Sequence, residues 1–328
     1  MSFILVDTAN TFFRSRHVVR GDADIKVGMA LHIMLNSVKK AWHDFEGKHV
    51  VFCLEGRSWR KDYYKPYKAN RAEARAAMTQ KEQEEDKLFW ETFDAFKEFI
   101  QNKTNCTVLH HPQLEADDLI AGFIQTHPND NHVIISTDSD FHQLLAPNVK
   151  QYNGVTEETH TLEGIFDKKG KLVKDKKTGE AKAVPNPEWL LFEKCMRGDS
   201  GDNVFSAYPG VRVKGTKNKV GLLEAFDDRN KKGWAWNNLM LQRWVDHEGK
   251  EHRVLDDYER NVKLIDLKAQ PENIRTIITE TIKAQTTEPK NISQVGIRLL
   301  KFCNLYDMQR IADSIQLYAE PFQARYTQ

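Results

Sequence analysis

The first half of the chain alternates short apolar runs with longer segments whose apolar residues recur every three or four positions. The short runs predict buried strands, and they lie at residues 3–6, 50–54, 107–109 and 133–135. The longer segments predict helices, and they lie at residues 25–45, 82–101 and 115–126. Continuous apolar strands that alternate with helices are typical of a parallel sheet covered on both faces. We therefore expect an α/β fold with a mostly parallel central sheet flanked by helices.

The second half has a different pattern. Residues 149–184 predict a strand and then a long hairpin or loop rich in Lys and Gly, and residues 187–197 predict a helix. Residues 204–226 predict a helix–loop–helix, and the pattern nearer the C-terminus is mostly helical. We therefore expect an α/β region over residues 1–185 and a mostly helical C-terminal region over residues 186–328.

Composition adds little about partners. The 328 residues include 48 Lys and Arg against 47 Asp and Glu, so the net charge of +1 gives no global sign of nucleic-acid binding. The 4 cysteines are far apart, which disfavours a zinc site or a disulfide framework and favours reduced thiols in the cytoplasm. The N-terminal apolar run is too short for a signal peptide, and no stretch approaches the roughly 20 apolar residues of a membrane span. We expect a cytoplasmic monomer without membrane contact.

Acidic residues gather at points that the predicted fold brings to one edge of the sheet. They follow three predicted strands, begin one helix and occupy a Gly-rich turn, and they are Asp7, Glu55, Glu115, Asp117, Asp118, Asp138, Asp140, Asp199 and Asp202. Open α/β sheets bind ligands at the carboxyl ends of their strands. Each acidic group alone would be a helix cap or a turn residue. Together, hard carboxylates without His or Cys favour Mg²⁺ or Mn²⁺, and a pair of such ions suits phosphodiester hydrolysis.

Two basic segments are candidates for nucleic-acid contact. The first interleaves tyrosines with cations, and it contains Arg57, Arg60, Lys61, Lys65, Tyr67, Lys68, Arg71 and Arg75. Cations for phosphates and aromatic faces for bases are the usual means of holding a single strand. The second is a tight loop containing Gly210, Lys214, Gly215 and Lys217, whose backbone N–H groups could bind a phosphate. The alternatives are an ordinary basic surface helix and a solvated loop. The lysine-rich residues 168–182 fit a solvated hairpin tip, with a nucleic-acid backbone contact as the alternative.

Five segments of the chain resemble motifs of the 5′-nuclease (flap endonuclease) superfamily, including its T-even phage ribonuclease H group. They are Ile4–Asp7, Trp59–Arg60 with Tyr67–Arg71, Leu114–Asp118, Ser136–Phe141 and Gly198–Asn203. Each motif is short, but the five stand in the family's order and spacing up to about residue 226. Residues 258–266 also resemble the C-terminal region of the T-even phage members.

This resemblance implies a 5′→3′ exonuclease and flap endonuclease that cuts DNA or RNA/DNA duplexes near 5′ ends, with two Mg²⁺ ions that Mn²⁺ can replace. One ion would be held by Asp7, Glu55, Glu115 and Asp117. The other would be held by Asp138, Asp140, Asp199 and Asp202, with Asp117 between the two sites and Asp118 close by. The implied duty is removal of RNA primers and flaps in phage DNA replication, where a single-strand-binding protein or a clamp is a candidate partner.

The resemblance also implies two nucleic-acid elements. A helical arch would span about residues 57–87, where Lys68 and Arg71 face the scissile phosphate as catalytic residues. A helix–three-turn–helix at about residues 198–226 would grip the duplex. The chain departs from the family at Glu55, where Asp is usual, and at Arg212, where many relatives have Gly and a loop that binds potassium.

Three other functions deserve comparison. A PIN-type ribonuclease shares the acidic sheet edge but not the arch-like segment or the duplex-binding loop. A haloacid-dehalogenase phosphatase needs a second Asp two residues after the first, and here the segment Asp7-Thr8-Ala9 lacks it. A catalytically inactive DNA-structure-binding protein is disfavoured because every expected carboxylate position is occupied.

Overall fold

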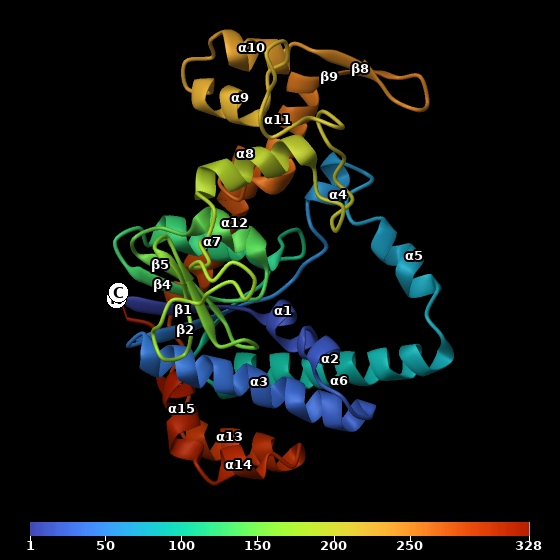
Figure 1. Ribbon diagram of the computed structural model, residues 1–328. Coiled ribbons are helices and arrows are strands. Elements are labelled where there is room, and N and C mark those ends of the chain that lie inside the picture. The colour runs from blue at the N-terminus through green and yellow to red at the C-terminus, as the bar shows by residue number, and fades with distance from the viewer. Residues whose placement is uncertain (328) are drawn as a thin grey trace. The chain divides into compact units, whose positions relative to one another are not determined.

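The computed structural model describes residues 1–327, which form two compact units. The first, here called the sheet unit, comprises Met1–Ser58, Met78–Val184 and the segment from Asn273 onward. The second, the helical unit, comprises Trp59–Ala77 and Pro185–Glu272. Figure 1 labels the elements of both. Each unit therefore combines separate stretches of sequence, whereas the sequence pattern predicted contiguous regions that meet near residue 185.

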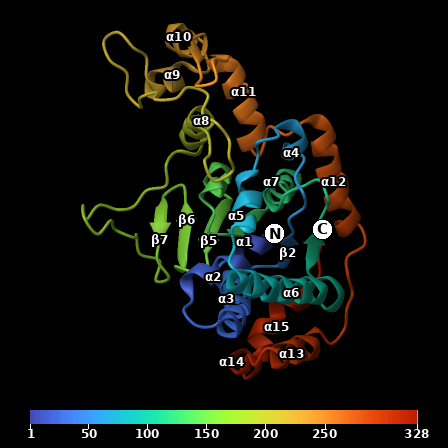
Figure 2. The same cartoon turned by 90° about the vertical axis from the view of Figure 1, so that its right-hand side faces the viewer.

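A seven-stranded sheet organises the sheet unit, with strand order β3-β2-β1-β4-β5-β6-β7. The strands are β1 Ser2–Asp7, β2 His49–Cys53, β3 Thr107–Leu109, β4 Asn131–Ile135, β5 Val149–Asn153, β6 Glu158–Thr161 and β7 Gly164–Phe166. The first five are parallel, and β6 and β7 add an antiparallel extension. Figure 2 shows β5, β6 and β7 side by side. The predicted mostly parallel sheet is confirmed.

The register of the parallel strands aligns their carboxyl ends. Val6 pairs with Phe52 on one side and with Ile135 on the other. The residues that follow these positions therefore leave the sheet at the same edge. This is the edge at which the sequence pattern placed most of the acidic residues.

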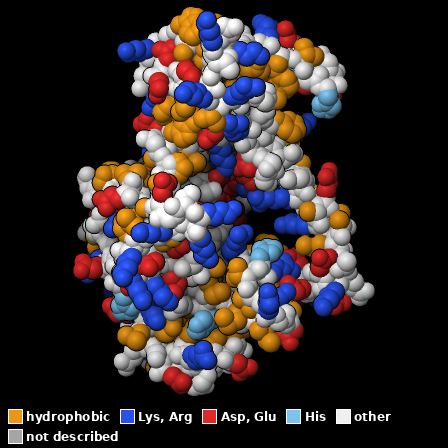
Figure 3. All heavy atoms as spheres, viewed as in Figure 1, with side chains coloured by type: hydrophobic (Ala, Val, Ile, Leu, Met, Phe, Trp, Pro, Cys, Tyr) orange, Lys and Arg blue, Asp and Glu red, His pale blue; other side chains and the backbone are white. Residues whose placement is uncertain are grey.

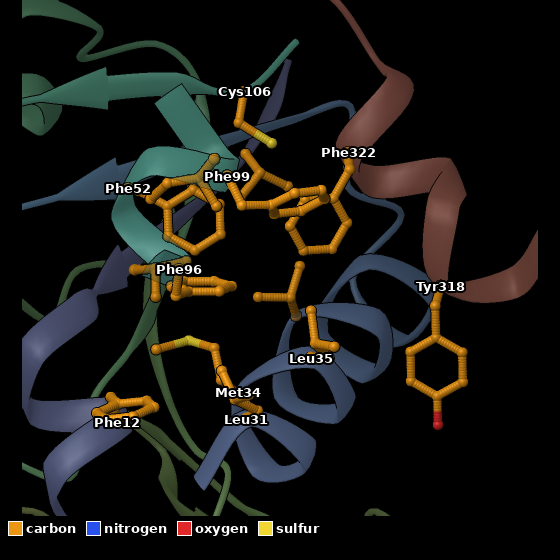
Figure 4. Packing of buried hydrophobic residues seen from close by; sticks show 14 of the residues in the cluster. Phe12, Leu31, Met34, Leu35, Phe52, Phe96, Phe99, Cys106, Tyr318 and Phe322 are labelled. Atoms are coloured by element: carbon orange, nitrogen blue, oxygen red, sulfur yellow. The ribbon is translucent and has the colours of Figure 1, made fainter. Parts of the chain in front are cut away.

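Helices cover both faces of the sheet because its central strands are apolar on both sides. One face packs against α3 (Ala23–Asp44), α6 (Gln80–Lys103), α13 (Val295–Leu305) and α15 (Ile315–Gln323). Figure 4 shows side chains of this core, among them Phe52, Phe96, Phe99 and Phe322. The opposite face packs against α7 (Ala116–Thr126), where the rings of Phe3 and Phe123 meet edge to face, 5.0 Å apart.

Local signals in the sequence explain where the long helices begin. The Thr79 hydroxyl accepts the Glu82 backbone N–H, and the Glu82 carboxylate accepts the Thr79 N–H, which forms a capping box at α6. Asn186 caps α8 (Pro187–Arg197), whose first residue is proline. The other sheet-unit helices are α1 Thr8–Phe13, α2 Ser15–Val18, α12 Glu272–Thr286, α14 Gln309–Ala312 and the 3₁₀ helix η1 Ser139–Leu144.

The helical unit has its own core, in which Phe192, Leu222, Trp236 and Leu239 are buried together. Its remaining elements are α4 Arg60–Tyr63, α5 Asn70–Ala76, α9 Leu222–Asp228, α10 Trp234–Met240, α11 Val254–Ile265 and the hairpin of β8 Arg243–Val245 and β9 Glu251–Arg253. The hairpin was not predicted from the sequence pattern. Trp236 belongs to this core and Trp189 and Trp244 pack against it, whereas Trp234 is 74% exposed.

The helix–loop–helix predicted within residues 204–226 is also wrong in part, because α9 is the only helix that the structure forms there. Asp199 and Val204 exchange backbone hydrogen bonds of 2.8 Å, and the Ala207 N–H donates to the Met196 carbonyl. These bonds fold residues 198–207 back on the end of α8 instead of letting a new helix begin. The two helices that flank the loop are therefore α8 and α9.

The four cysteines are free and buried. Burial raises the pKa of the Cys106 thiol to about 12 and that of Cys303 to about 11, so both remain protonated near neutral pH. No helix within residues 1–327 has the length and apolar character that crossing a membrane requires.

His49 should make the stability of the sheet unit depend on pH. Its Nε2 accepts the Thr107 N–H at 3.2 Å while its Nδ1 lies 3.2 Å from the Ala324 carbonyl, so the neutral ring fits this buried position. Burial lowers the pKa of His49 to about 4 from its ordinary value of 6.5. The unfolded chain therefore takes up a proton first as the pH falls, and the free energy of unfolding should decrease by about 3 kcal/mol between pH 7 and pH 4.

Urea unfolding of wild type and His49→Gln at several pH values would measure this contribution. The difference in unfolding free energy between the two proteins should shrink as the pH falls from 6.5 toward 4. Parallel pH profiles for both proteins would remove His49 from the explanation.

Candidate active site

The first carboxylate of the sheet edge is Asp7, the last residue of β1. Its side chain is 8% exposed, and its Oδ2 accepts a 2.8 Å hydrogen bond from the Ser136 hydroxyl. Its Oδ1 lies 3.4 Å from the Asn10 backbone nitrogen at the start of α1. The neighbouring strand β4 therefore helps to orient the carboxylate through Ser136.

The loop after β4 carries Asp138 and Asp140. Asp138 Oδ1 accepts the Asp140 N–H at 2.9 Å, and the Asp138 N–H donates to the Ser136 hydroxyl at 3.1 Å. The Gln151 amide of β5 donates to the carbonyls of Ser136 and Asp138 at 3.0 and 2.7 Å. Ser136 and Gln151 were not predicted as site residues. Ser136 could have been suspected from its place directly after an apolar strand, whereas nothing local in the sequence marks Gln151.

The densest acidic group lies at the start of α7. Glu115, Asp117 and Asp118 each offer an oxygen, and these oxygens lie within 4.8 Å of one another. Asp118 is fully buried, and its Oδ2 accepts the Glu115 N–H at 3.2 Å, so it caps the helix. Asp117 is partly exposed, and its Oδ1 accepts the Asp118 N–H at 2.9 Å. Three carboxylates this close repel one another unless a cation or protons neutralise them.

Glu55 reaches the same helix start from the end of β2. Its Oε2 accepts the Ala116 N–H at 2.8 Å. The following residue, Gly56, passes so close to the loop before α7 that a Cβ atom there would lie 2.2 Å from the His111 carbonyl oxygen. The close backbone approach, together with the long Glu side chain, therefore brings Glu55 beside Glu115 and Asp117.

The other two predicted ligands belong to the helical unit. Asp199 forms an ion pair with Lys194 at 2.8 Å, and its Oδ1 accepts the Gly201 N–H at 2.8 Å. Burial alone would raise the pKa of Asp199, but the hydrogen bond and charge of Lys194 hold it below its ordinary value. Lys194 and the backbone of the Gly-rich turn therefore already engage Asp199.

Asp202 receives three side chains from the base of the predicted arch. Arg71 Nη2 lies 2.9 Å from Oδ1, the Tyr67 hydroxyl donates to Oδ2 at 3.0 Å, and Lys68 Nζ lies 3.6 Å from Oδ2. The Lys68 N–H also donates to the Asp202 carbonyl at 2.8 Å, with Lys68 at a φ of 54°. The structure therefore brings the two predicted catalytic cations onto one predicted metal ligand.

Not every predicted nucleic-acid residue is available for that role. Arg60 is 1% exposed, and its Nε donates to the Leu264 carbonyl at 2.8 Å, so it acts in the core of the helical unit. Tyr67 is 3% exposed and acts through Asp202 instead of presenting its ring to a base. Arg57, Lys61 and Arg71 are exposed.

The loop before α9 also contains both predicted nucleic-acid residues that are exposed and one whose backbone donor is already engaged. Lys214, Lys217 and Gly210 are exposed, and Gly210 has a φ of 72°. The Gly215 N–H, however, donates to the Glu224 carboxylate at 3.0 Å, and the Gly221 N–H donates to the same carboxylate. Glu224 thus occupies the backbone donors that the sequence pattern offered to a phosphate. This corrects the predicted role of the Gly215 backbone and leaves the two lysine side chains as the candidates.

Comparison with known proteins agrees with this arrangement. Residues 2–175 match the family model for the 5′-3′ exonuclease, N-terminal resolvase-like domain. The chain belongs to the 5′-3′ exonuclease family. Members of this family are nucleases, enzymes that hydrolyse phosphodiester bonds.

Individual relatives cover different shares of the chain. It is 27% identical over 283 residues to the ribonuclease H of Enterobacteria phage T4, which covers 81% of each protein. It is 26% identical over 229 residues to the flap endonuclease of Escherichia phage T5, covering 69% of this chain and 70% of that protein. It is 31% identical over 181 residues to a DNA polymerase I of Rhizobium leguminosarum, but the match spans 15% of the polymerase.

Solved structures of the phage T5 enzyme share the fold. The T5 5′-exonuclease with bound zinc has a TM-score of 0.57 at 19% identity. The match covers 97% of this chain and 100% of the T5 chain. A T5 flap endonuclease complex with DNA and metal ions has a TM-score of 0.55, also at 19% identity, and covers 98% of this chain. At 19% sequence identity, this structural similarity shows that the chain has the α/β fold of the T5 enzyme.

Proposed function

We propose that this protein is a divalent-metal-dependent 5′→3′ exonuclease and flap endonuclease that cuts near the 5′ ends of DNA or RNA/DNA duplexes. The observation that carries the proposal is the group formed by Glu115, Asp117 and Asp118, whose oxygens lie within 4.8 Å of one another at the sheet edge. Asp7 and Glu55 follow strands that end at this edge. The T4 and T5 relatives, named as a ribonuclease H and a flap endonuclease, support this substrate class.

The donor set fits magnesium. The predicted ligands of the sheet unit offer carboxylate oxygens alone, the donors that Mg²⁺ and Mn²⁺ prefer. One ion would be held by Asp7, Glu55, Glu115 and Asp117, and Asp138 and Asp140 would contribute to a second. Asp199 and Asp202 belong to the helical unit, and their part in the ligand set stays a prediction. When bound, such ions lower the pKa of water and stabilise negative charge on a phosphate under attack.

The protein's own residues prepare the site. Ser136 and Gln151 fix the orientation of Asp7 and of the loop at Asp138, so that the carboxylates need little rearrangement to bind a cation. Asp118 fixes the start of α7 by capping it. In our proposal Lys68 and Arg71 offset charge on the scissile phosphate, and Lys214 and Lys217 contact the duplex backbone.

The proposed products carry a 5′-phosphate and a 3′-hydroxyl, and the proposed duty is removal of RNA primers and flaps during phage DNA replication. A PIN-type ribonuclease would cut single-stranded RNA without regard to a duplex junction. An inactive structure-binding protein would protect the junction without shortening the strand. The substrate therefore separates the three functions.

The test is incubation of a duplex with a labelled 5′ flap, in Mg²⁺ and in EDTA, beside a single-stranded RNA of the same length. Cutting at the junction in Mg²⁺, absent in EDTA, is the expected result. Tight binding of the flap without cutting would replace the proposal with the inactive binder, and cutting of the RNA alone would favour the PIN-type enzyme.

Glu55 should tune the concentration of metal that the enzyme needs. Asp at this position is shorter by one methylene and loses the 2.8 Å bond to the Ala116 N–H, whereas Gln keeps the bond and loses the charge. We expect Glu55→Asp to raise the half-saturating Mg²⁺ concentration by about tenfold and Glu55→Gln to raise it further. Initial cleavage rates across a Mg²⁺ titration would measure both. A wild-type titration curve for Glu55→Asp would show that the reach of Glu is irrelevant to the metal.

A further inference from the structure

Residues 167–183 form a hairpin next to β7 that none of the preceding functions uses. This basic hairpin contains three acidic residues and seven lysines, Lys168, Lys169, Lys171, Lys174, Lys176, Lys177 and Lys182, so its net charge is +4. The whole chain has a net charge of only +1, which leaves the remainder net negative. The hairpin is therefore a local concentration of positive charge in a chain of balanced composition, in addition to the basic segment at residues 57–75.

The basic hairpin is an ordered extension of the sheet. The Val173 N–H donates to the Ile165 carbonyl of β7 at 2.8 Å, and the Lys182 N–H donates to the Val173 carbonyl at 2.8 Å. Asp167 closes one turn by accepting the N–H groups of Lys169 and Lys171. Figure 2 shows the segment projecting outward beside β7. The lysines are thus held on a defined backbone instead of a loose loop.

Two of the three acidic residues of the hairpin are engaged by the backbone of their own turns. The Asp175 carboxylate accepts backbone N–H groups from Lys177 and Thr178, and Asp167 is engaged in the same way in its own turn. Hydrogen bonds from the backbone of Lys171 and Lys169 hold the pKa of Asp167 below its ordinary value. Both carboxylates therefore act first as turn acceptors.

Most of the lysines have no ion-pair partner. Lys168 forms a 3.1 Å ion pair with Glu157, and the other six have no carboxylate within ion-pair distance in residues 1–327. All seven are exposed. In Figure 3 Lys and Arg side chains gather on the visible face, over the yellow-green segment of Figure 1. Lysines at a sheet edge can also serve to prevent pairing between molecules.

The topology places one turn of the hairpin at the edge of the sheet that carries the carboxylates. Strand β5 ends at this edge, β6 returns from it and β7 runs toward it again, ending at Phe166 opposite Thr159. Lys168 and Lys169 follow at once. Three strand spacings separate β7 from β4 and five separate it from β2, roughly 15 to 24 Å, which corresponds to about four to seven base pairs of duplex.

We propose that the basic hairpin binds the phosphate backbone of the nucleic-acid substrate about four to seven base pairs from the scissile bond. This inference rests on the proposed function, because that function supplies a polyanion at the same edge of the sheet. The six unpaired ammonium groups match a polyanion in sign, and their ordered backbone limits the entropy lost on binding.

The test compares the triple variant Lys169→Ala, Lys171→Ala and Lys174→Ala with wild type in binding to a 5′-flap duplex. Binding is measured in Ca²⁺ between 50 and 200 mM salt, conditions chosen as roughly those over which phosphate contacts dominate affinity. Each lost phosphate contact lowers the slope of log affinity against log salt by about 0.9, so a decrease of about 2 to 3 is expected, with affinity about tenfold weaker or more. The matched control replaces three exposed lysines elsewhere, Lys103→Ala, Lys283→Ala and Lys301→Ala, and should keep the wild-type slope.

A hairpin variant with the wild-type slope and affinity would overturn the inference. A wild-type salt slope together with self-association of the hairpin variant would also overturn it. That result would mean that the lysines protect the sheet edge from pairing between molecules. Single-turnover cleavage in Mg²⁺ at saturating protein tests the proposed function separately, and the hairpin variant should keep the wild-type rate there. Failure of wild type to cut would reject the nuclease proposal, while the salt slopes would still report on the hairpin.

Discussion

Asp117→Asn is expected to reduce the single-turnover rate of flap cleavage by at least about 100-fold, to below a few per cent of wild type. Asp117 Oδ1 accepts the Asp118 N–H at 2.9 Å, and an Asn side chain can keep that bond through its own oxygen. The change therefore removes a charge from the acidic group while preserving the start of α7. The loss of rate should come from weaker cation binding and not from unfolding.

Two controls make this result specific. Asp94→Asn removes a charge from an exposed position on α6, where Asp94 pairs with Lys97, and should cut at the wild-type rate. The Kd of Asp117→Asn for the flap duplex, measured in EDTA, should stay within about threefold of wild type because phosphate contacts dominate affinity. Residual cleavage above a few per cent would contradict the assignment of Asp117 as a shared metal ligand.

Lys68→Ala is expected to lower the single-turnover rate by about 100-fold and to change duplex affinity by less than about threefold. The ammonium is placed by local structure, because the Lys68 N–H bonds to the Asp202 carbonyl and the side chain approaches the Asp202 carboxylate. Without it, Asp202 keeps Arg71 and Tyr67 as partners, so the loop should retain its conformation. The missing charge should then be felt mainly in the chemical step.

Rescue and exchange variants separate charge from structure at this position. Lys68→Arg restores a cation and should recover much of the rate. Lys65→Ala removes an exposed lysine three residues earlier and should cut at nearly the wild-type rate. An unchanged single-turnover rate in Lys68→Ala would remove Lys68 from the mechanism.

The sequence predicted best what depends on local pattern. Apolar runs located β1, β2, β3 and β4 to within about two residues at each end, and helical spacing located α3, α6, α7 and α8 as well. The acidic residues at the ends of β1 and β2 and at the start of α7 could be grouped because parallel strands end at a common edge. Whether they and the predicted ligands of the helical unit bind metal stays a prediction.

The errors share a physical cause, since they arise from hydrogen bonds that the local sequence pattern does not show. Arg60 is part of a basic run, yet it is buried because its guanidinium bonds to the Leu264 carbonyl, 204 positions away. The sequence pattern suggested that the Gly215 N–H donates to a phosphate, but in the structure this N–H donates to the Glu224 carboxylate. No local periodicity carries such information.

The division of the helical unit between two stretches of sequence has a consequence during synthesis. Tyr67 packs in a cluster with Cys195, Val204 and Leu264, all of which emerge from the ribosome more than a hundred residues later. At cellular translation speeds that interval is on the order of ten seconds, far longer than a helix or a hairpin needs to form. During this time residues 59–77 of the nascent chain lack their packing partners. Their lysines, arginines and tyrosines are then accessible to chaperones and proteases. A stalled or shortened chain that ends near residue 185 would hold the segment in that state permanently.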